Sequence, residues 1–264
     1  MAFYRNQELF YLVSLIFVLL ATNVHALSFD FPKLTPGDSS IILQGDAQIL
    51  ANGVLALTNS TPLPPTTTFS STGRALYTTP VPLWDSATGN VASFVTSFSF
   101  VTKLTGGFQT DGLVFFIAPV DTVIPNNSNS QYLGVVDSKS SINRFVGVEF
   151  DLYPNPFDPY LIHIGIDVNS LISTKTVKWN WVSGSLNKVS IIYDSPSNAL
   201  TAVITYENGQ ISTISQEIDL KAVLPNNVRI GFSATSITGV AQEIHSWSFV
   251  SDLKTTTSSS VSDI

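Results

Sequence analysis

The sequence predicts an all-β fold, an antiparallel jelly-roll sandwich, from three observations. Short runs of alternating apolar and polar residues, rich in Val, Ile and Phe, recur along the chain. Turn-forming pairs such as Asn52-Gly53 and Asn208-Gly209 separate these runs. Helical periodicity is nearly absent. Many short strands at this spacing are typical of two packed antiparallel sheets.

The run "VASFVTSFSFVT" shows the strand pattern most clearly, because Phe94, Phe98 and Phe100 fall on one face and Ser and Thr on the other. The runs "KVSIIYD", "ALTAVITYE" and "RIGFSA" repeat the pattern. Only "IDLKAVLP" fits a short helical turn. We therefore expect strands along the whole folded region and one short turn of helix.

The ends of the chain differ from its middle. Residues 1–26 resemble a secretory signal peptide, with Arg5 before an apolar run and small residues before a cut after Ala26. An uncleaved anchor is the alternative, but the apolar run is short for a bilayer. We expect residues 27–254 to form one β-sandwich domain, and residues 255–264, rich in Ser and Thr, a disordered tail. This predicts the secretory route, ending in an extracellular or vacuole-like lumenal compartment, with no membrane span in the mature chain.

Composition narrows the classes of partner. The chain of 264 residues has a net charge of -7 and only 12 Lys and Arg, which excludes a basic surface for nucleic acid. It has no cysteine and therefore no disulfides, and a chain of this length can bury a sufficient core without them. Two sequons, at Asn59 and Asn126, lie in polar, turn-rich stretches and are predicted glycosylation sites.

An acidic cluster stands out in "VEFDLYPNPFDPYLIHIGID". Glu149 and Asp151 are two apart in a strand pattern, so both side chains point to the same face. Carboxylates this close raise each other's pKa unless a cation lies between them. A hairpin return would bring His163 beside them. An all-oxygen subset that includes Asn155 and Asp158 suits Ca²⁺, whereas carboxylates with one histidine suit Mn²⁺. The alternative is a solvated acidic loop beside an ordinary core histidine.

Catalysis is a second interpretation of the same pair. Glu149 and Asp151 form an E-x-D pattern that also occurs in retaining glycosidases. Such an enzyme would need another acid along the same strand face, where this chain has Tyr153 and Asn155. A nucleophile elbow and a cysteine are also missing from the sequence. We therefore predict a protein that is not an enzyme.

At these residues the sequence resembles the legume lectins, over nearly all of the chain after Ala26. The resemblance rests on an ordered series of motifs: "GDAQILANGVLALTN", "PVPLWDSATGNVASFVTSFSFV", "DGLVFFIAP", "VGVEFD", "HIGIDVNS", "DLKAVLP", "RIGFSA" and "HSWSF". It implies a jelly-roll sandwich that carries Mn²⁺ and Ca²⁺ side by side. The implied Mn²⁺ ligands are Glu149, Asp151, Asp158 and His163. The implied Ca²⁺ ligands are Asp151, the carbonyl of Tyr153, Asn155 and Asp158.

The resemblance also implies a carbohydrate site. By position, Asp111 would accept hydrogen bonds from two sugar hydroxyls, Asn155 would bond a third, and the ring of Tyr153 would stack on the sugar. It further implies a cis peptide between Thr110 and Asp111. Gln131 stands where the family has a glycine that donates its amide. A side chain there disfavours φ > 0 and intrudes on the sugar.

The resemblance therefore predicts a secreted, metal-dependent lectin with weakened monosaccharide binding. Its partners would be glycans or glycoproteins, and it would form a homo-oligomer, a dimer or tetramer. The alternative function is a lectin-like scaffold that has lost sugar binding and acts as a defence, storage or protein-binding factor.

Overall fold

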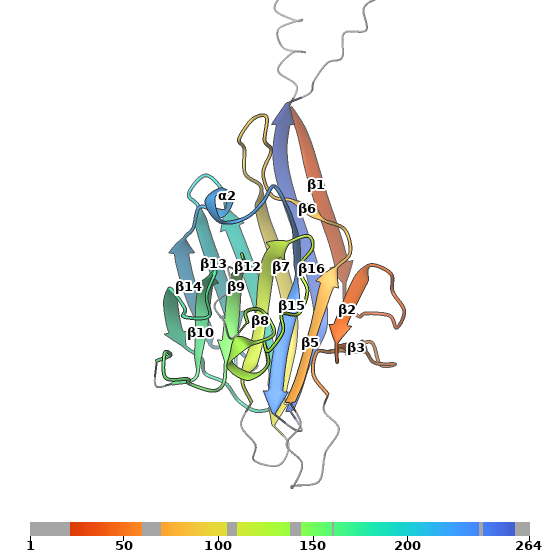
Figure 1. The fold of residues 1–264 in the computed structure, drawn as a ribbon, viewed down its shortest axis with the longest axis vertical. Coiled ribbons are helices and arrows are strands. Elements are labelled where there is room, and N and C mark those ends of the chain that lie inside the picture. The colour runs from red at the N-terminus through yellow and green to blue at the C-terminus, as the bar shows by residue number, and fades with distance from the viewer. Residues whose placement is uncertain are drawn as a thin grey trace, which may run out of the picture.

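A computed structural model describes residues 22–59, 70–104, 110–137, 144–159, 161–237 and 240–256. These residues form two antiparallel sheets, which we call the front and back sheets (Figure 1). The front sheet runs in the order β11 (Lys175–Lys178), β10 (His163–Val168), β9 (Val146–Asp151), β8 (Gly112–Pro119), β15 (Asn227–Ile237), β5 (Ser70–Tyr77) and β2 (Ile41–Gly45), with β6 (Val81–Pro82) also on β15.

The back sheet covers one face of the front sheet. Its order is β14 (Ile211–Glu217), β13 (Ala199–Thr205), β12 (Leu186–Asp194), β7 (Ser93–Leu104), β16 (Val240–Thr256), β4 (Leu55–Ala56) and β3 (Gln48–Ile49), and β1 (Thr22–Phe31) also pairs with β16. The predicted all-β sandwich is confirmed.

The main core lies between the two sheets. Phe94, Phe98 and Phe100 of β7 are 3%, 3% and 0% exposed, so the predicted apolar face of this strand is the core face. The rings meet aromatic rings of the front sheet, with centroids 4.9 Å apart for Phe98 and Phe232 and 4.8 Å apart for Phe100 and Phe150. Tilted and edge-on ring pairs at such distances add to the free energy gained from apolar burial.

The turn and helix predictions also agree with the structure. Gly53 and Gly209 adopt φ of 84° and 81°, the left-handed conformation that their turns require. The expected helical turn is α2 (Leu220–Val223), and the side chain of Asp219 caps it by accepting from the backbone nitrogen of Ala222 at 3.2 Å.

A second, smaller core lies on the outer face of the front sheet. Residues 120–136, which we call the site loop, follow β8 and contain the short 3-10 helix η1 (Ser130–Tyr132). Leu133 and Val135 of this loop are buried against side chains of the front sheet that include Leu76 and Phe116. The loop is therefore packed onto the sheet, although it has almost no regular structure.

The ends of the described chain lie side by side. β1 begins at Thr22, before the predicted cut after Ala26, and pairs with the end of β16, where Thr22 lies opposite Thr256. Most of the predicted signal peptide and of the tail after residue 254 lies outside the described residues, so both boundaries stay predictions. No helix within the described ranges is long and apolar enough to cross a membrane.

Candidate functional site

The acidic cluster is assembled by the pairing of β9 with β10. In this register His163 lies opposite Asp151, and Gly165 lies opposite Glu149. The hairpin return predicted from the sequence therefore exists. Glu149, Asp151 and His163 are all buried, and one ligand atom from each lies within 4.8 Å of the other two. Nε2 of His163 is 3.1 Å from Oε1 of Glu149.

Burial makes this cluster electrostatically costly. It raises the pKa of Asp151 to about 8, and the charge of Glu149 adds to the rise. For His163, burial by itself lowers the pKa, but the hydrogen bond and charge of Glu149, with the nearby aspartates, reverse this and raise it. Closely spaced buried carboxylates are stabilised by a divalent cation more than by any single neutral partner. The donor set therefore fits a metal ion.

A second group of oxygen atoms lies in the loop after β9. The side-chain amide of Asn155 has its oxygen 3.1 Å from the carbonyl oxygen of Tyr153 and 3.1 Å from Oδ2 of Asp158. Three acceptors that face one another repel, so either the amide is turned to donate from its nitrogen or a cation lies among them. The backbone nitrogen of Asn155 donates to the same Oδ2 at 2.8 Å, which fixes the turn. Oxygen ligands of this kind are those that Ca²⁺ prefers.

Three residues beside the cluster were not predicted from the sequence. Gly165 leaves the space that Glu149 needs, because a Cβ at Gly165 would lie 2.5 Å from Oε1 of Glu149 and 1.9 Å from Oγ of Ser173. The Ser173 hydroxyl lies 2.5 Å from that Oε1 and 2.8 Å from Oδ1 of Asp167. Burial raises the pKa of Asp167 well above its usual range. A glycine opposite an acid on the next strand is the signal that could have revealed this arrangement.

Asp111 lies directly beside the metal-ligand candidates. It precedes β8, in which Gly112 pairs with Asp151, and its backbone oxygen accepts from the nitrogen of Leu152 at 2.8 Å. Its carboxylate is 4% exposed and accepts a hydrogen bond from the Ser130 hydroxyl at 2.9 Å. Burial raises the pKa of Asp111, and the hydrogen bond from Ser130 opposes the rise. Ser130 is a contact that sequence patterns did not indicate.

Gln131 reaches the other candidate sugar ligand. Its Oε1 lies 3.2 Å from the Nδ2 atom of Asn155, so the side chain does enter the site. Its backbone has no positive φ; in this stretch Ser130, with φ 55°, holds that conformation. The expectation that a side chain at position 131 disfavours φ > 0 agrees with this backbone, in which the neighbouring Ser130 is left-handed. Tyr153 is 36% exposed and leaves its ring accessible.

A buried polar side chain hydrogen-bonds to Thr110, the residue before Asp111. Gln242, which is fully buried in β16, donates from Nε2 to the Thr110 hydroxyl at 3.3 Å and accepts from the Thr102 hydroxyl at 2.7 Å. The peptide bond between Thr110 and Asp111 is trans, since the described residues contain no cis peptide. The implied cis bond is thus wrong for this structure. The trans form is favoured by about 3–4 kcal/mol in non-proline peptides.

The structure thus brings the predicted metal and sugar residues to one end of the front sheet. Whether each residue binds an ion or a sugar stays a prediction. The asparagines of both predicted glycosylation sites are exposed. Asn126 is exposed in the site loop and Asn59 is exposed at the end of a described segment, while Ser60 and Thr61 of that sequon lie outside the described residues.

Comparison with known proteins places this site in a family. The model of the legume lectin domain matches residues 26–264. A non-seed lectin of Pisum sativum is 75% identical over 265 residues, covering 100% of both chains. A galactose-binding lectin of Arachis hypogaea is 48% identical over 258 residues, covering 93% of this chain and 92% of that one. The solved structure of a Lotus tetragonolobus seed lectin isoform superposes with a TM-score of 0.79 at 54% identity, covering 85% of this chain and 98% of that chain. The chain therefore belongs to the legume lectin family, and it is a carbohydrate-binding protein and not an enzyme.

Proposed function

We propose that this lectin depends on two metal ions and binds free monosaccharides weakly. A Mn²⁺-like ion would be held by Glu149, Asp151, Asp158 and His163, and a Ca²⁺ by Asp151, the Tyr153 carbonyl, Asn155 and Asp158. Legume lectins bind metal ions, and the buried cluster in this chain is a suitable place for them. When bound, the ions would neutralise the buried acids and hold the loop from Tyr153 to Asp158, which carries Asn155, in one shape.

The sugar would bind at Asp111, Asn155, Tyr153 and Gln131. Asp111 supplies a charge-assisted acceptor, Asn155 an amide and Tyr153 a ring face. One observation carries the proposal of weak binding: both polar groups already have partners in the site loop. The Ser130 hydroxyl donates to Asp111, and the Gln131 side chain is hydrogen-bonded to Asn155. A monosaccharide must displace or tolerate these contacts, so its net gain in hydrogen bonds is small.

A printed glycan array, probed with the purified protein before and after chelation, tests the proposed function. We expect binding to extended glycans that chelator abolishes and that added Ca²⁺ and Mn²⁺ restore, together with weak binding of free galactose. Binding that is indifferent to chelator would contradict the metal dependence. The absence of any glycan binding would favour the alternative, a scaffold that has lost sugar binding and serves in defence, storage or protein binding.

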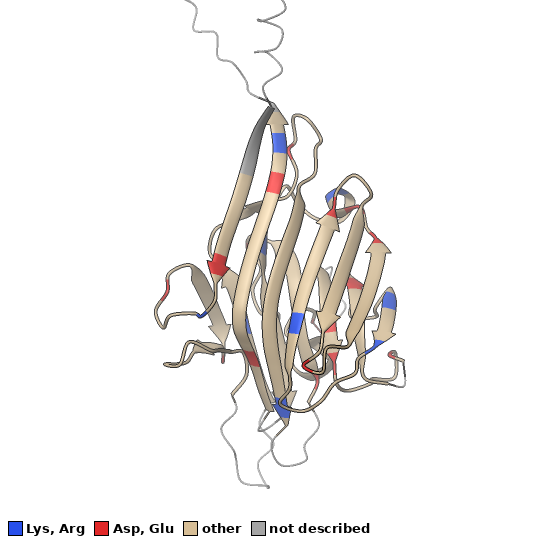
Figure 2. Cartoon of the chain, turned by 180° about the vertical axis from the view of Figure 1, so that it is seen from behind, with Lys and Arg blue, Asp and Glu red and all other residues tan. Residues whose placement is uncertain are grey.

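We also propose a homo-oligomer, a dimer or tetramer, that forms through the back sheet. Few positions along the strands of this sheet are Lys, Arg, Asp or Glu (Figure 2). Ile192, Val95 and Val250 lie in register across β12, β7 and β16 and are 39%, 37% and 49% exposed. Such a row is an apolar surface suited to self-association. Sedimentation of the purified protein tests the assembly, and a monomer at all concentrations would contradict it.

The proposed destination is the secretory pathway, either outside the cell or in a vacuole-like lumen. The support is the signal-like start of the sequence and the exposed sequon asparagines Asn59 and Asn126. The mature N-terminus, determined by sequencing, tests this proposal; an intact Met1 would contradict it.

A further inference from the structure

Arg74 is a buried charge that lies outside both proposed ligand sets. It lies in β5 opposite Gln44 of β2, is 1% exposed, and is on the face of the front sheet that carries the second core. Arg74 forms no ion pair within the part of the chain that the structure describes. Its Nε atom also lacks a hydrogen-bond partner there. Burying an uncompensated cation is costly, and here it lowers the pKa of Arg74 to about 9.

The remaining guanidinium nitrogens bind the two ends of the site loop. Nη1 donates to the Thr122 hydroxyl at 3.1 Å, near the start of the loop, and Nη2 donates to the backbone oxygen of Gly134, near its end. The guanidinium carbon lies 4.9 Å from the centre of the Phe116 ring, which supports it from below. A planar fork of fixed geometry can hold two acceptors at once, which a single ammonium group does less well.

Further buried donors continue this row of contacts toward the sugar site. Ser233 of β15 donates to the backbone oxygen of Leu133 at 2.6 Å, and Thr235 donates to that of Ser130 at 2.7 Å. Gly134 allows the close approach, because a Cβ there would lie 2.6 Å from the Ser233 hydroxyl and its φ is 67°. Ser130, which contacts Asp111, is thus held by its own backbone oxygen, and Gln131, which contacts Asn155, lies between the two held residues Ser130 and Leu133.

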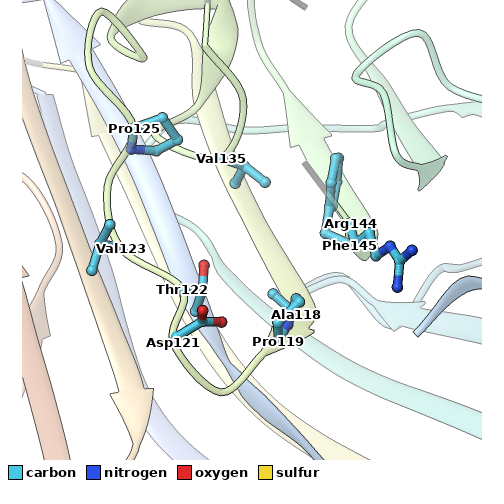
Figure 3. Close-up of a pocket in the computed structure, with 9 residues that line it drawn as sticks. All are labelled: Ala118, Pro119, Asp121, Thr122, Val123, Pro125, Val135, Arg144 and Phe145. Carbon is cyan, nitrogen blue, oxygen red and sulfur yellow. The ribbon is translucent and has the colours of Figure 1, made fainter. Parts of the chain in front are cut away.

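The outer side of the site loop is less closely packed. There the loop borders a cleft of about 330 Å³ that separates it from the start of β9 (Figure 3). Asp121 lines this cleft from the loop side, and Arg144 and Phe145 line it from the other side. Other side chains hold the start of the loop, since Gln44 donates to the backbone oxygen of Thr122 at 3.3 Å and Arg229 to that of Val120 at 2.8 Å. Arg74 differs from them because it hydrogen-bonds to both ends of the loop.

We propose that Arg74 is a positioning residue for the carbohydrate site: by holding Thr122 and Gly134 together, it places Ser130 and Gln131 against Asp111 and Asn155. Arg74 touches no sugar and acts through the backbone of the site loop. The effect on sugar binding rests on the proposed function, whereas the effect on the loop does not.

Hydrogen exchange measured by mass spectrometry tests the effect on the loop. Arg74→Met keeps the length of the side chain but removes the donors. We expect exchange of the amides in residues 128–136 to rise about tenfold or more, the factor expected from losing a hydrogen bond to a charged group. Arg74→Lys keeps the charge without the fork, and should restore only part of the protection.

Arg229 provides the matched control. It also donates to backbone oxygens: that of Val120, the first residue of the site loop, at 2.8 Å, that of Tyr77 at 3.1 Å, and that of Thr78. It thus contacts one end of the loop and, unlike Arg74, makes no hydrogen bond to residues 128–136, all of which the structure describes. Arg229→Met should leave exchange of residues 128–136 unchanged. Unchanged exchange in Arg74→Met would overturn the proposal. An equal rise in both variants would also overturn it, because it would show general loosening of the fold.

Calorimetric titration with galactose gives the second measurement. If the unaltered protein binds galactose, Arg74→Met should weaken the affinity about tenfold, while bound metal measured by elemental analysis stays the same. Unchanged affinity with a loosened loop would overturn the link from Arg74 to the sugar site. If the unaltered protein binds no galactose, the proposed function loses support, and hydrogen exchange still decides the role of Arg74.

Discussion

Replacing Gln131 with glycine tests the proposed cause of weak monosaccharide binding. The Gln131 side chain lies 3.2 Å from the Asn155 amide, which the sugar would otherwise use. Gln131→Gly removes this competitor and clears the space in front of Asn155. The backbone at Gln131 has no positive φ, so the gain would come from the lost side chain and not from relief of strain.

The expected magnitude follows from the single contact that is removed. One hydrogen bond of ordinary geometry contributes about 0.5–1.5 kcal/mol net. If the sugar no longer has to break it, affinity should rise by about 2- to 13-fold. Gln131→Gly should also lower the free energy of unfolding by about 0.5–1 kcal/mol, because glycine increases the conformational entropy of the unfolded chain. Gln131→Ala removes the same contact with less of this cost and is the matched control.

Calorimetric titration of the three proteins with galactose and with mannose measures the effect. Both variants should bind at least one of the sugars more tightly than the unaltered protein, and by similar factors. Asp111→Ala in the Gln131→Gly background should abolish that binding, because the sugar hydroxyls lose their charged acceptor. Equal affinities in all three proteins would refute the reasoning. Binding that survives Asp111→Ala would place the sugar elsewhere.

Three further predictions concern the metals, the space beside Glu149 and the ionisation of Asp111. Chelation should lower the midpoint of thermal unfolding, since ions at a hundredfold excess over Kd add about 2.7 kcal/mol; an unchanged midpoint with no metal by elemental analysis would falsify the two-metal proposal. Gly165→Ala should lose bound metal and about 1–3 kcal/mol of stability, because the new Cβ would lie 2.5 Å from Oε1 of Glu149; elemental analysis showing full metal content would contradict this. Burial raises the pKa of Asp111 in the folded protein above 3.8, its value in the unfolded chain. The protonated carboxyl therefore contributes its full stability below pH 3.8, and this contribution is lost as the pH rises through the folded-state pKa. In metal-free urea titrations, Asp111→Asn should therefore gain stability relative to the unaltered protein between about pH 3 and about pH 7, and a constant difference would argue against it.

The sequence by itself determined the sandwich and most of the candidate metal cluster. Alternation with period two is a local property, so the shared face of Glu149 and Asp151 and the buried face of β7 could be predicted from neighbouring residues. The strands that return His163 to Asp151 follow each other along the chain, so their pairing follows from two adjacent strand patterns. The residues proposed to bind sugar were identified from the family resemblance and not from any such pattern.

Only the tertiary structure decided what surrounds the residues proposed to bind sugar. Ser130 and Asp111 are 19 residues apart, Gln131 and Asn155 are 24 apart, and Arg74 and Gly134 are 60 apart. These contacts depend on how an irregular loop packs onto the front sheet, and an irregular loop has no period that fixes where its side chains point. The left-handed backbone at Ser130 belongs to the same loop packing, because the buried hydroxyls of Ser233 and Thr235, which are far from it in the chain, donate to backbone oxygens of the loop.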